Sequence, residues 1–384
     1  MKKYIPLLFI FCFLASCAQD SIFYNISMEP EPRDPIIPGT PVNIVVYQNR
    51  MYTGSFLGQR IYSFPNEEER WSPWSSPGGS LGGLASDGDN LYALVFPRGD
   101  PLTASEIKIF RDGTWENVTK HGDVLPYSIQ SIYGAGDRIF AGAQIRHTNS
   151  VEYAILQIVK NGDQRELRVL LENTSLLTGA AWRGENSYLL STAGHGIYNF
   201  GLASIDGPVL PPFLLPETIN TVVSGIIQIP EGPTVAVSNT GSGRGNIIII
   251  ESNDTITTLA TEGFNYTGGL ALWRNHDDHT APPSLLLLGV RNRGFSLAHG
   301  YREMTLGAGG IPVPGLRIPG NETISSVEDR PRYSASIGTH PVNHLIQVPH
   351  SVIPWSADTV PIIFAGTSIR GLWSYREGQW NAED

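Results

Sequence analysis

The stretch IIFAGTSIRGLWSYREGQW, Ile362 to Trp380, shows how this chain is built. It consists of a short apolar run, a Gly-marked turn that holds Arg370, a second apolar run and a closing Trp. Short runs of β-branched and aromatic residues bounded by Gly and Ser predict β-strands joined by tight turns. The stretch therefore predicts paired strands, and its meaning depends on whether it is unique in the chain.

The same pattern recurs from residue 41 onward. Two copies agree in detail, VSGIIQIP at Val223–Pro230 and VNHLIQVP at Val342–Pro349. Each copy reads as a strand, a short turn, a strand ending in small residues, a loop, an apolar strand, and a turn into a strand that often holds Trp. The second strands of the seven copies centre on Gly54, Leu94, Gly142, Thr192, Val237, Gly289 and Gly366.

These centres are 40, 48, 50, 45, 52 and 77 residues apart. Four short strands in a unit of about 45 residues are typical of a β-propeller blade. The chain resembles the broad class that includes WD40, quinoprotein-like and sensor-regulator propellers, without the motif of any one family. We expect an all-β, seven-bladed β-propeller of four-stranded blades, with small residues where backbones crowd near the axis. The long last spacing predicts a Gly/Pro-rich insertion at Leu306–Gly320.

The N-terminus has the features of a lipoprotein signal. Lys2 and Lys3 precede an apolar run at Tyr4–Phe13, which is too short for a membrane-spanning helix of about 20 residues. The run ends in LASC, which resembles the bacterial lipobox and implies cleavage and acylation, with palmitate for example, at Cys17. An ordinary cleaved signal is the alternative. We expect a signal peptide at 1–16, the lipidated Cys and a Pro-rich tether at 17–40, and the propeller at 41–384.

Composition supports this fold class and limits the partners. The chain holds 41 Gly and 28 Pro, with 10% aromatic and 16% charged residues, as a turn-rich all-β protein does. Its formal charge of −10 becomes −12 when the two signal lysines are removed. An acidic chain argues against nucleic acid as the main partner. We expect a monomer that is attached to the membrane through its N-terminal lipid.

Motifs of enzyme chemistry were sought directly. The chain contains no G-x-S-x-G elbow, no H-E-x-x-H and no P-loop. The segment NHDDH, Asn275–His279, could hold a metal through its His and Asp side chains, but a polar turn explains it equally well. We expect no catalytic residues, no cofactor and no metal. A glycan-active hydrolase or lyase that uses the central channel is the alternative.

One set of residues recurs at a single place in the repeat, the loop between the second and third strands. Because 21 of the 26 basic residues are Arg, and because this loop approaches the mouth of the channel in propellers, Arg side chains there could attract a carboxylate-bearing partner. Alternatively, each Arg pairs with a carboxylate of a neighbouring blade. The candidate ligand-binding residues are Arg60, Arg98, Arg146, His195, Arg244, Arg293 and Arg370.

These features together favour a lipid-anchored, non-catalytic recognition or scaffold protein. One propeller face would bind an acidic protein or a carboxylate-bearing glycan in the bacterial envelope. A scaffold for outer-membrane protein assembly is the alternative. Ala18 follows the lipidated Cys in place of the Asp that retains enterobacterial lipoproteins at the inner membrane, which favours the outer membrane. The side of that membrane is left open.

Overall fold

The computed structural model describes residues 36 to 383 with several gaps. Among these residues, no helix is long and apolar enough to cross a membrane. The signal peptide, Cys17 and most of the expected tether lie outside the described residues. The described residues are 36–97, 99, 105–161, 164–184, 187–201, 213–240, 245–261, 265–274, 281–291, 300–318, 322–323, 337, 340–354, 362–368, 370–376 and 379–383.

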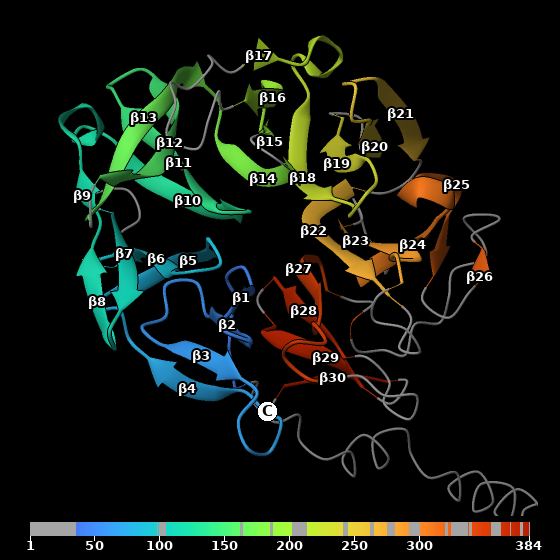
Figure 1. Ribbon diagram of the computed structural model, residues 1–384, viewed down its shortest axis with the longest axis horizontal. Coiled ribbons are helices and arrows are strands. Elements are labelled where there is room, and N and C mark those ends of the chain that lie inside the picture. Colours follow the sequence, from blue (N-terminus) through green and yellow to red (C-terminus); the bar gives the residue numbers. More distant parts are fainter. Residues whose placement is uncertain are drawn as a thin grey trace, which may run out of the picture. The chain divides into compact units, whose positions relative to one another are not determined.

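Seven antiparallel sheets follow one another along the chain and form the blades of a β-propeller (Figure 1). The predicted fold class and blade number are therefore confirmed. Blade 1 contains β1 (Val45–Tyr47), β2 (Arg50–Gly54), β3 (Ile61–Phe64) and β4 (Ser72–Ser75). Blade 2 contains β5 (Ser80–Ser86), β6 (Leu91–Phe96), β7 (Glu106–Arg111) and β8 (Thr114–Asn117). Blade 3 contains β10 (Ser128–Ala135), β11 (Arg138–Arg146), β12 (Val151–Asn161) and β13 (Gln164–Thr174).

The remaining four blades repeat this order. Blade 4 contains β14 (Leu177–Gly184), β15 (Ser187–Thr192), β16 (Gly196–Gly201) and β17 (Phe213–Leu214). Blade 5 contains β18 (Val222–Gln228), β19 (Thr234–Asn239), β20 (Gly245–Ile250) and β21 (Ile256–Thr261). Blade 6 contains β22 (Asn265–Trp273), β23 (Leu285–Arg291), β24 (Gly300–Leu306), β25 (Pro312–Ile318) and β26 (Glu322–Thr323). Blade 7 contains β27 (Val342–Gln347), β28 (Ile363–Thr367), β29 (Leu372–Arg376) and β30 (Gln379–Ala382).

Short elements join some of the blades. The strand β9 (Thr119–Lys120) pairs in parallel with β13 and adds a fifth strand to the outer edge of blade 3. Three single turns of 3-10 helix are η1 (Gly122–Val124), η2 (Pro216–Thr218) and η3 (Ala308–Gly310).

The segment Leu306–Gly320 differs from the prediction. It was expected to be an insertion without strands, but most of it is β25, the fourth strand of blade 6, which pairs with β24. Its prolines escape the usual penalty of proline in a sheet because outer strands leave many backbone groups unpaired. Because Pro and Gly occupy several of its positions, the segment lacks the alternation of apolar and polar residues that would have predicted a strand.

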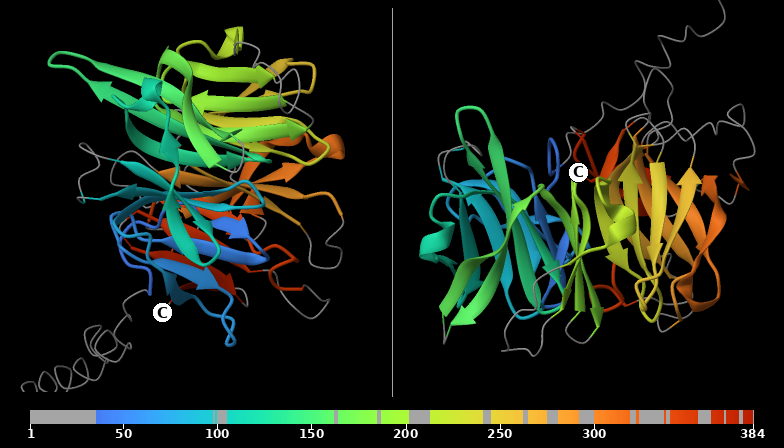
Figure 2. Two further views of the ribbon diagram at one scale, coloured as in Figure 1. Left: turned by 60° about the vertical axis from the view of Figure 1, so that its left-hand side comes forward. Right: turned by 90° about the horizontal axis from the view of Figure 1, so that it is seen from above.

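The blades place their loops on two opposite faces of the body, as the edge-on view shows (Figure 2). Within each blade the strands run antiparallel, so one face collects the loops between second and third strands together with the connections between blades. We call this the loop face. The turns between first and second strands lie on the other face, which we call the turn face.

The core consists of seven hydrophobic clusters, one at each interface between neighbouring blades. The second strand of each blade is packed on both of its faces, and β6, the second strand of blade 2, is buried along its whole length. Trp373 and Trp380 belong to the cluster between blades 6 and 7. The expected backbone crowding is also present, because a Cβ on Gly289 would lie 2.2 Å from the carbonyl oxygen of Val342.

An irregularity in the pairing interrupts the first strand of blades 2 to 7 at the same place, directly after a buried apolar residue near the start of this inner strand. Polar side chains near the start of the inner strands bond to the backbone of the next blade. Thr178 Oγ1 donates to Val223 O at 2.8 Å, and Asn43 Oδ1 accepts from Leu84 N at 2.8 Å. These bonds lock neighbouring inner strands in register.

The ring closes between blades 1 and 7. Residues 36–40, which we expected in the tether, instead lie along blade 7. Ile36 N donates to Glu383 O, and Gly371 N donates to Gly39 O, both at 2.7 Å. Below this contact, Phe64 and Trp71 of blade 1 pack against Phe364 of blade 7.

Candidate functional site

The structure describes four of the seven predicted ligand-binding residues, and all four lie on the loop face. Arg60, Arg146 and Arg370 are exposed, and His195 is half-buried. They stand in separate loops of blades 1, 3, 4 and 7, and no described contact brings two of them together. The other three, Arg98, Arg244 and Arg293, lie outside the described residues.

The alternative explanation for these arginines was pairing with carboxylates. Among the residues that the structure describes, the guanidinium groups of Arg60, Arg146 and Arg370 form no ion pair. By contrast, Arg183 and Arg376 do pair with carboxylates, at 2.5 and 3.4 Å. The exposed arginines of the loop face therefore keep their donors available to a ligand within the described part of the protein.

The loop face also carries apolar side chains that the sequence reasoning missed. Ten large apolar side chains are exposed among the described residues, and six of them lie on this face: Phe56, Leu57, Leu125, Val151, Ile219 and Val222. Exposed single apolar residues are ordinary, but several on one face beside arginines mark an interaction surface. The apolar pair Phe56-Leu57, within a loop otherwise rich in Ser and Gly, is the sequence signal that could have revealed it.

The loop that carries Phe56, Leu57 and Arg60 is held in place by blade 2. Leu57 N donates to Leu81 O, and Leu81 N donates to Gly58 O, both at 2.7 Å. The ring of Phe56 meets that of Phe96 edge-to-face, with centroids 6.4 Å apart. The loop is thus preorganised, which lowers the entropy cost of binding.

A cavity of about 570 Å³ opens on the same side between blades 2 and 3. Lys120, Gln144 and Arg146 contribute polar groups to its wall, and Leu125 and Pro126 contribute apolar surface. The ammonium group of Lys120 donates to Ser105 O at 2.8 Å, and burial lowers the pKa of Lys120. This groove combines two cations and the carboxylate of Glu106 with the most exposed of the apolar side chains, since Leu125 is 68% exposed.

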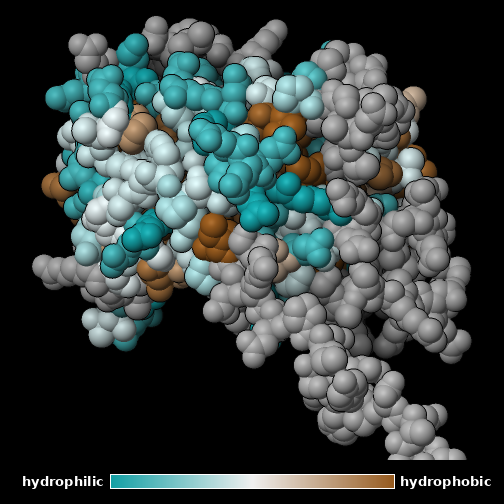
Figure 3. Space-filling model, turned by 90° about the horizontal axis from the view of Figure 1, so that it is seen from below, coloured by the Kyte–Doolittle hydropathy of each residue, from teal (hydrophilic) through white to brown (hydrophobic). Residues whose placement is uncertain are grey.

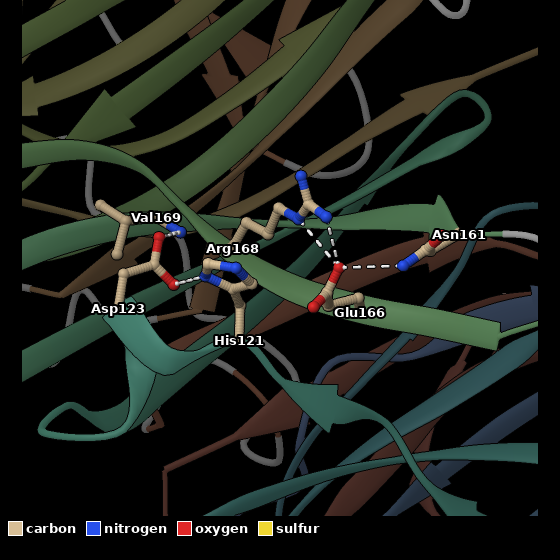
Figure 4. Close-up of polar contacts among 6 residues, drawn as sticks. All are labelled: His121, Asp123, Asn161, Glu166, Arg168 and Val169. Carbon is tan, nitrogen blue, oxygen red and sulfur yellow. Dashed lines mark hydrogen bonds and ion pairs between the residues drawn. The ribbon is translucent and has the colours of Figure 1, made fainter.

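The outer wall of this groove is fixed to β13 by polar contacts (Figure 4). His121 Nδ1 and Asp123 Oδ1 are 2.8 Å apart, and Asp123 Oδ2 accepts from Val169 N at 3.4 Å. On the same strand, the Arg168 guanidinium donates to Glu166 at 2.6 and 2.9 Å. The connection that presents Leu125 is therefore anchored to β13 through Asp123.

A second cavity of about 470 Å³ lies over blades 5 to 7. The side-chain amides of Asn239 and Asn343 form hydrogen bonds within the protein. Asn239 Nδ2 donates to Tyr266 O at 2.8 Å, and Asn343 Nδ2 donates to Ser368 Oγ at 2.9 Å. Arg291 is exposed at its edge. Arg291 ends the second strand of blade 6 as Arg146 ends that of blade 3, so it joins the arginines of the loop face although our sequence reasoning chose Arg293.

The NHDDH segment and one histidine of an inner strand bear on metal binding and charge. The NHDDH segment lies outside the described residues, and no group of three or more potential metal ligands occurs within them. His344 lies half-buried on the inner strand β27, where desolvation lowers the pKa of its imidazole to about 4. It is therefore neutral at pH 7.

The side of the body that faces the lower edge of Figure 1 offers a contrast. Where it is not grey, it is mostly hydrophilic, with small separate hydrophobic patches (Figure 3). The part of this side that the structure describes carries no continuous apolar surface, so the loop face is the better candidate.

Comparison with known proteins shows the fold but no family. No protein-family model and no curated protein sequence matches the chain. The structure is similar to YCF48 from Cyanidioschyzon merolae, with a TM-score of 0.52 and 10% identity over 90% of this chain and 98% of that one. It is also similar to a YCF48 bound to a D1 peptide, with a TM-score of 0.51 and 12% identity over 91% of this chain and 96% of that one. A gluconolactonase from Xanthomonas campestris aligns with a TM-score of only 0.44 at 13% identity, over 67% of this chain and 85% of that one.

Proposed function

We propose that this chain is a lipid-anchored, non-catalytic recognition protein that binds a protein partner through its loop face. The observation that carries the proposal is the combination on one face of six exposed apolar side chains with arginines that have no carboxylate partner among the described residues. Apolar anchors surrounded by Arg are the usual composition of protein–protein interfaces.

The charge of the chain indicates what kind of partner fits. The protein is acidic overall, with a formal charge of −10, so cations concentrated on one face would orient an acidic partner towards that face and away from the rest of the surface. A partner segment that carries both carboxylates and apolar side chains matches this surface. The groove beside Leu125 and Arg146 provides a place for such a segment to lie.

The fold is compatible with this role. A YCF48 that shares the propeller fold has been captured with a D1 peptide. That likeness shows that a propeller of this size can bind a peptide, and it supports peptide or protein binding here without identifying the partner. The proposal itself rests on the surface of the loop face.

Anchoring is the second part of the proposal and rests on the sequence. The lipobox-like LASC would place a lipid on Cys17, and the Pro-rich residues that follow would hold the body away from the membrane. We place the protein at the outer membrane of a bacterial envelope. Palmitate labelling of the wild-type chain and of Cys17→Ala tests this part separately, since label on the variant would contradict it.

Site-specific photo-crosslinking tests the binding surface. A photoreactive phenylalanine analogue is introduced into the full chain at Leu57 or Leu125 on the loop face, and at Ile311 or Val313, which are similarly exposed at the start of β25 on the turn face. We expect discrete protein adducts from the first two positions only. Equal adducts from all four positions, or none from the loop face, would contradict the proposal. If the adduct is an outer-membrane protein, the recognition role becomes one in envelope assembly.

A further inference from the structure

The turn face carries a separate pocket that the proposed function does not use. A cavity of about 490 Å³ lies where the inner strands of blades 3, 4 and 5 end. Its wall is formed mainly by small and aliphatic residues, with one aromatic and one exposed acidic side chain. The residues that matter here are Gly136, Trp182, Ile226, Ile227 and Glu231.

Trp182 provides a broad aromatic surface in this pocket. Its indole lies against the α-carbon of Gly136, because a Cβ on that glycine would be 2.8 Å from indole Cγ and Cδ2. Gly136 has a φ of +58°, so the position favours glycine for its backbone as well. With this support on one side, Trp182 is still 45% exposed, which is unusual for so large an aromatic side chain.

The other strongly polar side chains of the pocket already have partners. Arg183 donates to Asp254 Oδ1 at 2.5 Å and to Glu251 O at 2.6 Å. Gln228 Nε2 donates to Ile229 O and to Gly232 O at 2.7 and 2.8 Å. Both Nε2 hydrogens of Gln228 are thus used, and the Arg183 guanidinium is held by Asp254 and Glu251, which balances its charge within the protein.

Glu231 is the polar side chain that remains. It is exposed in the turn that joins β18 to β19, and its carboxylate forms no ion pair among the described residues. The pocket thus combines an aromatic face, two isoleucines and a carboxylate acceptor. A sugar needs several donors and acceptors around its ring, whereas a cation on an apolar chain needs only an aromatic face and a counter-ion.

We infer that this pocket binds the side chain of an arginine or lysine presented by a partner protein. The cation would lie over the indole of Trp182 and pair with Glu231, and its methylene groups would contact Ile226 and Ile227. This site lies on the face opposite the arginines. Because its charged group is the carboxylate of Glu231, it selects a cation, and its test is independent of the proposed function.

Calorimetric titration of the full chain with two capped peptides tests the inference. Tetra-arginine carries the cation, and tetra-citrulline is its neutral counterpart of nearly the same shape. We expect tetra-arginine to bind at least tenfold more tightly at 0.15 M salt, where long-range attraction to an acidic surface is screened. Trp182→Ala should weaken binding at least fivefold, and Trp182→Phe, which keeps an aromatic face, should weaken it less.

A matched pair of charge variants separates the pocket from general electrostatic attraction. Glu231→Gln should weaken tetra-arginine binding at least threefold, whereas Glu217→Gln, which removes one charge from an exposed turn elsewhere, should leave it unchanged. Equal effects of the two variants, equal binding of tetra-citrulline, or unchanged binding by Trp182→Ala would each overturn the inference. An unchanged thermal midpoint in each variant shows that the fold is intact.

Discussion

Replacement of Phe364 by alanine tests how the ring is closed. Phe364 is fully buried in blade 7, and its ring centroid lies 4.9 Å from that of Phe64 and 5.2 Å from that of Trp71, both in blade 1. The guanidinium carbon of Arg376 lies 5.8 Å from the same ring. This side chain therefore joins the first and last blades, in addition to the backbone hydrogen bonds between residues 36–40 and blade 7.

The expected loss can be worked from these contacts. Truncation of a buried Phe to Ala lowers the free energy of unfolding by about 4 kcal/mol, and the two edge-to-face contacts account for about 1 kcal/mol of that. In a body of this size, about 4 kcal/mol lowers the thermal midpoint by about 5 °C. Chemical denaturation followed by tryptophan fluorescence measures the loss, and Trp71 beside the site reports it.

Phe213→Ala is the matched control. Phe213 is 52% exposed on β17, so the same chemical change there should alter the free energy of unfolding by less than about 0.5 kcal/mol. Similar losses for the two variants, or a loss below about 1 kcal/mol for Phe364→Ala, would refute the packing argument for ring closure.

Two further predictions concern the inner strand β27 of blade 7 and its contacts. Because the pKa of His344 is about 4 in the folded protein and about 6.5 when unfolded, the unfolded state binds more protons between these values, so stability falls by about 3 kcal/mol as pH drops from 6.5 to 4. His344→Gln should flatten that part of the pH dependence of the unfolding free energy, and an unchanged slope would contradict the assignment. Gly289→Ala should destabilise the protein by about 3 kcal/mol, because the added Cβ would lie 2.2 Å from Val342 O. Gly122→Ala, where a Cβ meets no atom within 4 Å, should be nearly neutral, and equal thermal midpoints for the two glycine variants would disprove the crowding argument.

The repeat made the fold predictable from the sequence. Each blade carries an apolar second strand between Gly-marked turns, and this pattern located a residue of all seven second strands, from Gly54 to Gly366. The fourth strand of blade 6 was missed because β25 pairs with β26 only at Arg317 and Ile318. Its first half, which holds the Pro and Gly residues, pairs only with β24 among the described residues, so its sequence carries little of the alternation that marks a strand.

The site was less predictable, for a physical reason. The position of an Arg in a repeat can be read from the sequence, but whether it pairs with a carboxylate depends on neighbours that are distant in the chain. The exposure of apolar side chains likewise depends on distant neighbours. The ring of Phe56 on the loop face, for example, is positioned by Phe96 of the next blade. The pocket at Trp182 likewise depends on Gly136, 46 residues earlier in the chain.

The loop face is the central claim, and its arginines offer the most direct test. The measurement is the yield of the photo-crosslinked adduct from position 57 in the full chain, with and without the triple substitution Arg60→Ala, Arg146→Ala and Arg370→Ala. We predict that the triple variant loses at least nine-tenths of the adduct while its thermal midpoint stays unchanged, since Arg anchors contribute most at interfaces. An undiminished yield, or a loss matched by a lower midpoint, would contradict recognition by the loop face.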